Sequence, residues 1–307
     1  MNNYKKNIAT LFIFLMLGSW ANLASAADAP VACTGAGSSA DPITTTLSVG
    51  TPECLTEPDI YKIKIYEMGV CATAPTLANL ATACTPISTI ANGGLITVAN
   101  GVNSAIPGTF TRPDNGTYAY GYVIMAPEFR ITSTKTFNDT YRGLSANTGT
   151  TCWTLAGTTR DSLTTTAYDG SGTLVAMDAE TRTTYLADCG STPAPGETIY
   201  VQDSFGGADI SIDSADAHVG PLPVGNSTVE AYLTDTNLVR ATTSAAVARL
   251  VGFVTLGDVI TVSDDTSTFV SSFSVSQGSQ VIWTGKDSIN NIRSMGSGPF
   301  AVKFSVE

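Results

Sequence analysis

The chain is poor in charge and almost lacks histidine. Charged residues make up 13% of its 307 residues, and His218 is the single histidine. A serine hydrolase needs a histidine base beside its serine, and the GxSxG pattern of many such enzymes does not occur. The CxxC pairs typical of zinc sites are also missing. These absences favour a protein that is not an enzyme, although a glycosidase that uses two carboxylates needs no histidine and stays an open alternative.

Basic residues are few as well. The chain has 15 Lys and Arg against 26 Asp and Glu, a formal net charge of −11. Such a surface repels phosphates, so the sequence predicts no nucleic-acid partner. Most of the acids are typical of a solvated surface. The cluster Asp209, Asp213 and Asp216 is the best candidate for a metal, because calcium needs only oxygen ligands in a loop, and calcium is the one cofactor that we consider.

A long apolar run occurs only at the start of the chain. Lys5 and Lys6 precede the apolar residues 8–17, and the small residues 24–26 follow. This layout predicts a signal peptide over residues 1–26 that is cleaved after Ala26. No later segment is long and apolar enough to span a membrane. We therefore expect a secreted protein, located outside the cell or at its surface, with no membrane span in the mature chain.

All six cysteines lie after the predicted signal peptide. Export to an oxidising compartment favours disulfides, and six cysteines allow 15 pairings. Pairing of neighbours in the sequence closes the shortest loops at the least entropic cost. On that argument the expected pairs are Cys33 with Cys54, Cys71 with Cys84, and Cys152 with Cys189.

Abundant threonine indicates β structure, because β-branched side chains fit a pleated sheet better than a helix. Residues 59–71 alternate sharply and predict a strand with Tyr61, Ile63 and Ile65 on one face. Residues 76–84 fit a short helix, and the Asn115-Gly116 pair predicts a tight hairpin. Short strands separated by turns continue to the C-terminus. The sequence thus predicts an all-β protein, an antiparallel sandwich or jelly roll that contains disulfides.

The cysteine distribution suggests two β modules. We expect an extended leader over residues 27–58, a cysteine-containing β domain over 59–190, a linker over 191–197 and a cysteine-free β domain over 198–307. The alternative is one elaborated sandwich in which the closing strands of the chain pair with the strand at residues 61–67 and the middle of the chain is an insertion.

Two segments with regular alternation are candidates for assembly with a neighbouring copy. If extended, each presents one face made of these residues: Ile43, Thr45, Leu47 and Val49 in the leader, and Phe300, Val302, Phe304 and Val306 at the C-terminus. An edge strand offers unpaired amides and carbonyls to another chain, and a leader strand can add to a neighbour's sheet. A leader that folds back onto its own subunit is the alternative.

This general arrangement resembles that of donor-strand pilins, from whose small subunits the chain differs in length and in its six cysteines. The sequence predicts a secreted structural subunit that joins copies of itself into an extracellular filament, a pilus-like fibre or a surface coat. The alternative is a secreted adhesin or carbohydrate-binding protein whose partners are surface glycans. Tyr118, Tyr120 and Tyr122 bear on that alternative, since exposed rings could stack on sugars, but such a row is more typical of a sandwich interior.

Overall fold

The computed structural model describes most of the chain after the predicted signal peptide. The described residues are 31–45, 53–99, 107–145, 147–160, 167–168, 174–175, 187–202, 218–221, 228–284, 290–298 and 300–307.

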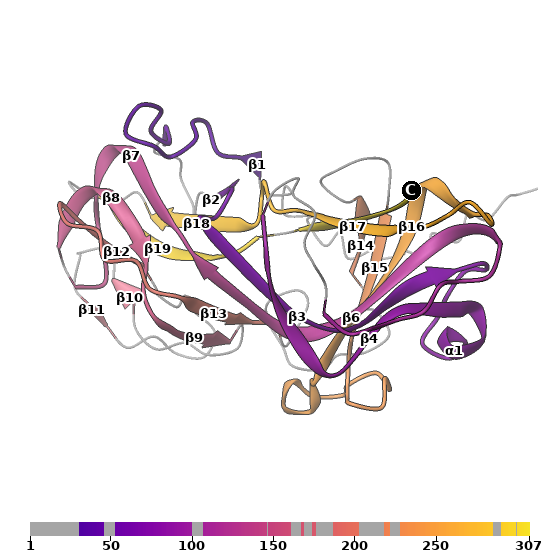
Figure 1. The fold of residues 1–307 in the computed structure, drawn as a ribbon. Coiled ribbons are helices and arrows are strands. Elements are labelled where there is room, and N and C mark those ends of the chain that lie inside the picture. Colours follow the sequence, from indigo (N-terminus) through magenta and orange to yellow (C-terminus); the bar gives the residue numbers. More distant parts are fainter. Residues whose placement is uncertain are drawn as a thin grey trace, which may run out of the picture.

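The largest sheet, here called the large sheet, has nine strands centred on β6 (Figure 1). Its main strand order is β14-β15-β16-β6-β3-β4-β5, while β13 pairs with the far end of β6 and β9 pairs with β13. The strands are β3 (Ile60–Cys71), β4 (Cys84–Val98), β5 (Thr109–Phe110), β6 (Gly116–Thr132), β9 (Gly157–Arg160), β13 (Thr198–Val201), β14 (His218–Pro221), β15 (Thr228–Thr234) and β16 (Arg249–Val262). The predicted alternation of β3 is confirmed, since Tyr61, Ile63 and Ile65 are all buried.

A second sheet of seven strands lies at one end of the molecule. Its strand order is β1-β2-β18-β19-β7-β8-β12. The strands are β1 (Val31–Ala32), β2 (Glu53–Thr56), β7 (Thr134–Arg142), β8 (Thr148–Thr154), β12 (Ala187–Gly190), β18 (Ser279–Thr284) and β19 (Asn290–Ser297). The remaining elements are the strand pair β10 (Ala167–Tyr168) and β11 (Leu174–Val175), the helix α1 (Leu80–Ala83) and a 3-10 turn at Ser244–Ala246.

One continuous length of chain joins the two sheets. Only Ser133 separates β6 from β7, and this residue is fully buried. Its backbone N–H donates to Thr154 Oγ1 at 3.0 Å, and its carbonyl accepts from the Thr154 N–H at 2.9 Å. The backbone groups at the junction are thereby satisfied, so the chain leaves one sheet and enters the other without a loop.

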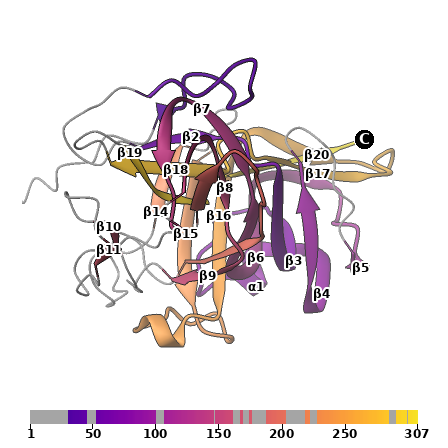
Figure 2. The ribbon, with the colours of Figure 1, turned by 90° about the vertical axis from the view of Figure 1, so that its left-hand side faces the viewer.

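The third unit is a two-stranded sheet made of β17 (Phe269–Ser274) and β20 (Ala301–Val306), here called the C-terminal ribbon. Its apolar face packs on the large sheet and closes the main core, which includes Ile63, Phe273 and Phe304. The helix α1 lies on the opposite side of the large sheet (Figure 2). The predicted all-β antiparallel fold is thus confirmed. Among the described residues, the sandwich has a broad layer faced by a layer of two strands.

The boundary expected at residues 191–197 does not separate the sheets. Strands that follow this segment pair with strands that precede it. Thus β16 and β13 pair with β6, β18 pairs with β2, and β19 pairs with β7. The expected linker is also fixed in place, because the Glu197 carboxylate binds Lys62 and Arg130. Cysteines mark where loops are cross-linked rather than where sheets end, so their distribution is a poor guide to strand pairing. Strands from both sides of residues 191–197 thus share both sheets, while β3 itself pairs with β4 and β6 rather than with a strand from the end of the chain.

The hairpin expected at Asn115-Gly116 is wrong. The strand β5 pairs with β4, while the start of β6 pairs with the end of β16, at Gly116 opposite Val262. Asn115 Nδ2 donates to Asp264 Oδ1, and the guanidinium of Arg112 bonds to Asn115 Oδ1 at 2.7 Å. These contacts hold the turn against the loop after β16, so long-range pairing overrides the local turn preference.

Candidate functional site

The outer edge of β20 is the first candidate site. Thr268 and Glu307 exchange reciprocal backbone hydrogen bonds at the end of the ribbon, each at 3.0 Å. In an antiparallel pair, bonded and non-bonded residue pairs alternate. Counting back along β20, the N–H and C=O groups of Val302, Phe304 and Val306 therefore point away from β17. No strand among the described residues pairs with this edge.

The side chains of β20 hold that edge in a fixed position. Val302 and Phe304 are buried, and the partly buried Phe300 and Val306 pack on the same core cluster. The alternation expected for this strand is therefore what the structure shows. Opposite Phe304 lies Gly121 of β6, where an added Cβ would come within 2.8 Å of the Phe304 ring. The absence of a side chain at Gly121 thus allows β20 to approach the large sheet.

The leader residues lie within their own subunit. Ile43 is fully buried, and its N–H donates to the Thr136 carbonyl at 2.8 Å. Thr45 is also buried and accepts a 2.6 Å hydrogen bond from the Tyr141 hydroxyl. The sequence allowed the leader to join a neighbour's sheet or to fold back onto its own subunit. For Ile43 and Thr45, the structure shows the second arrangement. Leu47 and Val49 lie outside the described residues.

Three disulfides cross-link the chain. They join Cys33 to Cys54, Cys71 to Cys84, and Cys152 to Cys189, which are the pairs given by sequential pairing. The second and third each join directly opposed residues of neighbouring antiparallel strands. The first ties the leader to β2, so residues 33–54 form a closed loop on their own subunit.

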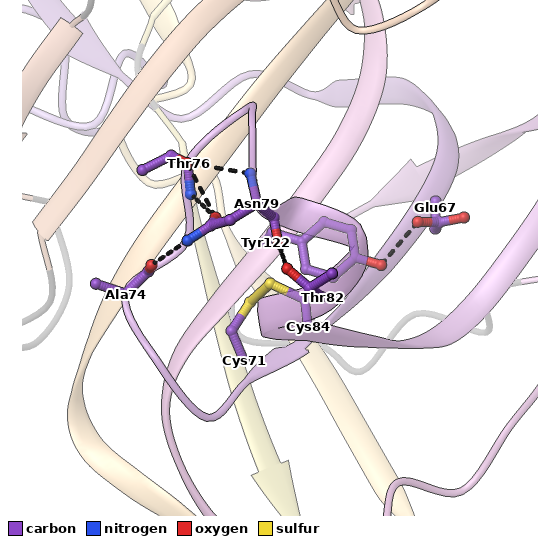
Figure 3. The surroundings of a disulfide bond; sticks show 8 residues. All are labelled: Glu67, Cys71, Ala74, Thr76, Asn79, Thr82, Cys84 and Tyr122. Carbon is purple, nitrogen blue, oxygen red and sulfur yellow. Dashed lines mark hydrogen bonds between the residues drawn. A yellow bond between two sulfur atoms is a disulfide. The ribbon is translucent and has the colours of Figure 1, made fainter.

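The Cys71–Cys84 disulfide closes a short loop above the outer face of the large sheet (Figure 3). Hydrogen bonds within the loop converge on Asn79, whose Oδ1 accepts from the Thr76 N–H at 2.6 Å and whose Nδ2 donates to the Ala74 carbonyl at 3.2 Å. The predicted helix is present as the single turn α1, which directly precedes Cys84. The disulfide and the Asn79 bonds make this loop a rigid cap, here called the disulfide cap.

A groove opens between the disulfide cap and strands β6, β15 and β16. It is lined by Ala74, Pro75, Tyr120, Thr228, Val229, Glu230, Phe253, Val254 and Thr255. The ring of Tyr120 is half-buried and that of Phe253 is buried, while Thr228 and Thr255 are exposed. The groove therefore combines aromatic surface with hydroxyl groups and one carboxylate.

The tyrosine row of β6 is split between the two faces of the large sheet. A register shift between β6 and β16 falls between Tyr118 and Tyr120. Tyr118 consequently belongs to the main core, whereas Tyr120 and Tyr122 belong to the cluster beneath the disulfide cap. The buried Tyr122 hydroxyl donates to Glu67 Oε1 at 2.7 Å, and burial, reinforced by this carboxylate, raises the pKa of Tyr122 far above its usual range. Tyr122 is thus a neutral donor, and Tyr120 is the tyrosine of the row that lines the groove.

Cations gather on the same face of the sheet, outside the groove. The Arg249 guanidinium lies 3.7 Å from the centre of the Tyr66 ring, and Lys64 Nζ lies 5.4 Å from the same ring. Arg240 stacks similarly on Tyr232 at 4.6 Å. Both arginines are therefore held by aromatic partners.

The metal site expected at Asp209, Asp213 and Asp216 lies outside the described residues. Elsewhere, within the described ranges, no group of three His, Cys, Asp or Glu side chains is arranged to hold a metal ion. The backbone of His218 opens β14 and pairs with Ala231. In the described part of the chain, neither length nor hydropathy lets any helix cross a membrane.

Sequence reasoning did not find the groove. Its lining comes from segments more than 150 positions apart in the sequence, which β6 and β16 bring together by pairing. The one usable signal was the short spacing of Cys71 and Cys84 around Pro75, which predicts a tight loop but not what lies under it. Comparisons with protein-family models, with characterised proteins and with solved structures find no match to this chain.

Proposed function

We propose that this chain is a secreted structural subunit that joins copies of itself by strand addition at the outer edge of β20. The observation that carries the proposal is the two-stranded layer of the sandwich. In the described structure β20 has a partner on one side only, and its outward backbone groups belong to Val302, Phe304 and Val306. A strand from another molecule would satisfy these groups and widen the narrow layer.

The edge is suited to strand addition because it is already ordered. The apolar face of β20 packs on the main core, so the unpaired groups are held in strand geometry before a partner arrives. Preorganisation of this kind lowers the entropic cost of association.

The Cys33–Cys54 disulfide argues against the leader as the added strand. It ties residues 33–54 to β2 of the same subunit, and Ile43 is occupied within the fold. A better donor is the outer edge of β4, where the pairing found among the described residues is confined to the region of Ile87, Ser88 and Thr89. Leu95, farther along β4, is 48% exposed. Joining β4 of one copy to β20 of the next is a heterologous contact, which builds an open chain when it does not close into a ring.

The experiment compares Val306→Pro with Val306→Ala in the mature protein. Proline removes the outward N–H of residue 306, which the subunit itself does not use, and its fixed backbone angle is tolerated at an edge. Alanine removes similar packing but keeps the N–H. We expect filaments or large oligomers from the wild-type protein and from Val306→Ala, and single subunits from Val306→Pro, by negative-stain electron microscopy and light scattering.

Two results would contradict the proposal. One is a wild-type protein that stays monomeric at every concentration tested. The other is a Val306→Pro variant that assembles as well as Val306→Ala. The wild-type protein and Val306→Ala could instead form closed dimers that Val306→Pro does not form. That result would support strand addition at β20 but would exclude the open chain.

A further inference from the structure

Several side chains that carry hydrogen-bonding groups line the groove beside the disulfide cap and have no partner among the described residues. These groups are the hydroxyls of Tyr120, Thr228 and Thr255 and the carboxylate of Glu230. Within the described residues, no side-chain hydrogen bond or ion pair engages any of these four groups. A ligand that fits the groove must therefore offer several hydroxyl or amide groups of its own.

The other residues that line the groove are apolar. The half-buried ring of Tyr120 and the ring of Pro75 lie on its lining, with Phe253 buried beneath. The disulfide and the Asn79 bonds fix the cap that carries Pro75. Aromatic rings stack on flat apolar surfaces, and one face of a pyranose ring is such a surface. The groove thus pairs a stacking wall with hydroxyl-binding groups.

Charge decides which kind of sugar fits. Glu230 is the one acidic or basic residue among the lining residues, and a carboxylate accepts hydrogen bonds from hydroxyls but repels another carboxylate. Arg249 and Lys64, which could attract an anion, do not line the groove and lie against Tyr66 instead. From this arrangement we infer that the groove binds one residue of a neutral saccharide, stacked on Tyr120 and hydrogen-bonded to Glu230. The inference does not depend on self-assembly.

The test is saturation-transfer NMR of the mature protein with glucose, galactose, mannose and N-acetylglucosamine, followed by titration of any sugar that responds. N-acetylneuraminic acid serves as the anionic comparison. We expect saturable millimolar binding of at least one neutral sugar, weakened roughly tenfold or more by Tyr120→Ala because the stacking surface is lost. Glu230→Gln keeps the shape of the side chain but removes its charge and one acceptor, so it should weaken binding several-fold.

Tyr66→Ala is the matched control, because Tyr66 is a half-buried tyrosine on the same face that does not line the groove. Its affinity should equal that of the wild-type protein. If Tyr120→Ala fails to fold, as judged by circular dichroism, the comparison of Glu230→Gln with Tyr66→Ala decides instead. No saturable binding of any of the four neutral sugars, tighter binding of N-acetylneuraminic acid, or equal losses in the groove and control variants would each overturn the inference.

Discussion

At the scale of single residues, Gly121 decides how closely the two layers of the sandwich approach. A Cβ at this position would lie 2.8 Å from Cε2 and 3.0 Å from Cδ2 of Phe304. Phe304 is buried, so its ring has little room to move aside. Gly252 lies in the same sheet, but its Cβ would come no nearer than 3.5 Å to Val123. The two glycines therefore form a matched pair.

We predict that Gly121→Ala lowers the free energy of unfolding by about 1–3 kcal/mol, the usual cost of overpacking a core. Gly252→Ala should change it by no more than about 0.5 kcal/mol. Urea denaturation followed by fluorescence measures both. Equal effects of the two substitutions would show that the contact with Phe304 does not limit the spacing of the layers.

Glu197 shows at the same scale why residues 191–197 are not a free linker. Its hydrogen bond to Lys62, with the charges of Lys62 and Arg130, lowers the pKa of the Glu197 carboxyl. A carboxylate with a lowered pKa stabilises the fold above its ordinary pKa, and that contribution disappears as the pH falls through the lowered value. The segment is thus attached to β3 and β6 most firmly at neutral pH.

At the scale of elements, the disulfide cap depends on the bond between Cys71 and Cys84. The two cysteines are 13 positions apart, whereas Cys152 and Cys189 are 37 positions apart and belong to the core of the second sheet. Removing either disulfide raises the conformational entropy of the unfolded chain. Only the loss of the Cys71–Cys84 disulfide also loosens the disulfide cap, which forms one wall of the groove. Comparing variants that lack one or the other disulfide can therefore distinguish an effect on stability from an effect on ligand binding.

We predict that the double variant Cys71→Ala, Cys84→Ala loses about 3 kcal/mol of unfolding free energy, the chain-entropy value for a loop of this size. It should also lose most of its affinity for the neutral sugar. The double variant Cys152→Ala, Cys189→Ala should be destabilised at least as much and keep its affinity while folded. Denaturation and NMR titration at a temperature where both are folded measure this, and an affinity loss in both variants would contradict a local role for the cap.

Individual elements were predictable where a local pattern and the tertiary structure agree. The alternation around Ile63 fixes both the strand β3 and its buried face, and the run near Leu80 gives a helical turn, shorter than expected. The hairpin predicted at Asn115-Gly116 does not form, because the hydrogen bonds of Asn115 to Arg112 and Asp264 hold this turn against the loop after β16. The edge of β20 was predictable from alternation, but the groove was not, because its walls meet only after distant strands pair.

At the scale of the whole molecule, both sheets interleave strands from distant parts of the chain. The large sheet places β16 beside β6, and the second sheet places β18 beside β2. Neither half of the chain contains all the described strands of the large sheet or of the second sheet. Such non-local pairing makes folding slow and strongly cooperative, because most contacts form only after long loops close.

We predict that residues 27–190 and 198–307, expressed separately, do not fold, since separation removes β16 and β13 from β6, β18 from β2, and β19 from β7. Neither fragment should show near-ultraviolet circular dichroism or a cooperative urea transition, whereas the intact mature chain should show both. A cooperative transition in either isolated fragment would restore the two-module interpretation of the sequence.

The junction at Ser133 has a mechanical consequence. The strands β6 and β7 form one extended segment of backbone that runs from the large sheet into the second sheet (Figure 1). Tension applied between the two ends of the molecule would therefore act along this segment. The hydrogen bonds from β6 to β3 and β16 lie across that direction, so they would be loaded together in shear rather than peeled apart one by one. A molecule built this way is expected to resist stretching along its length.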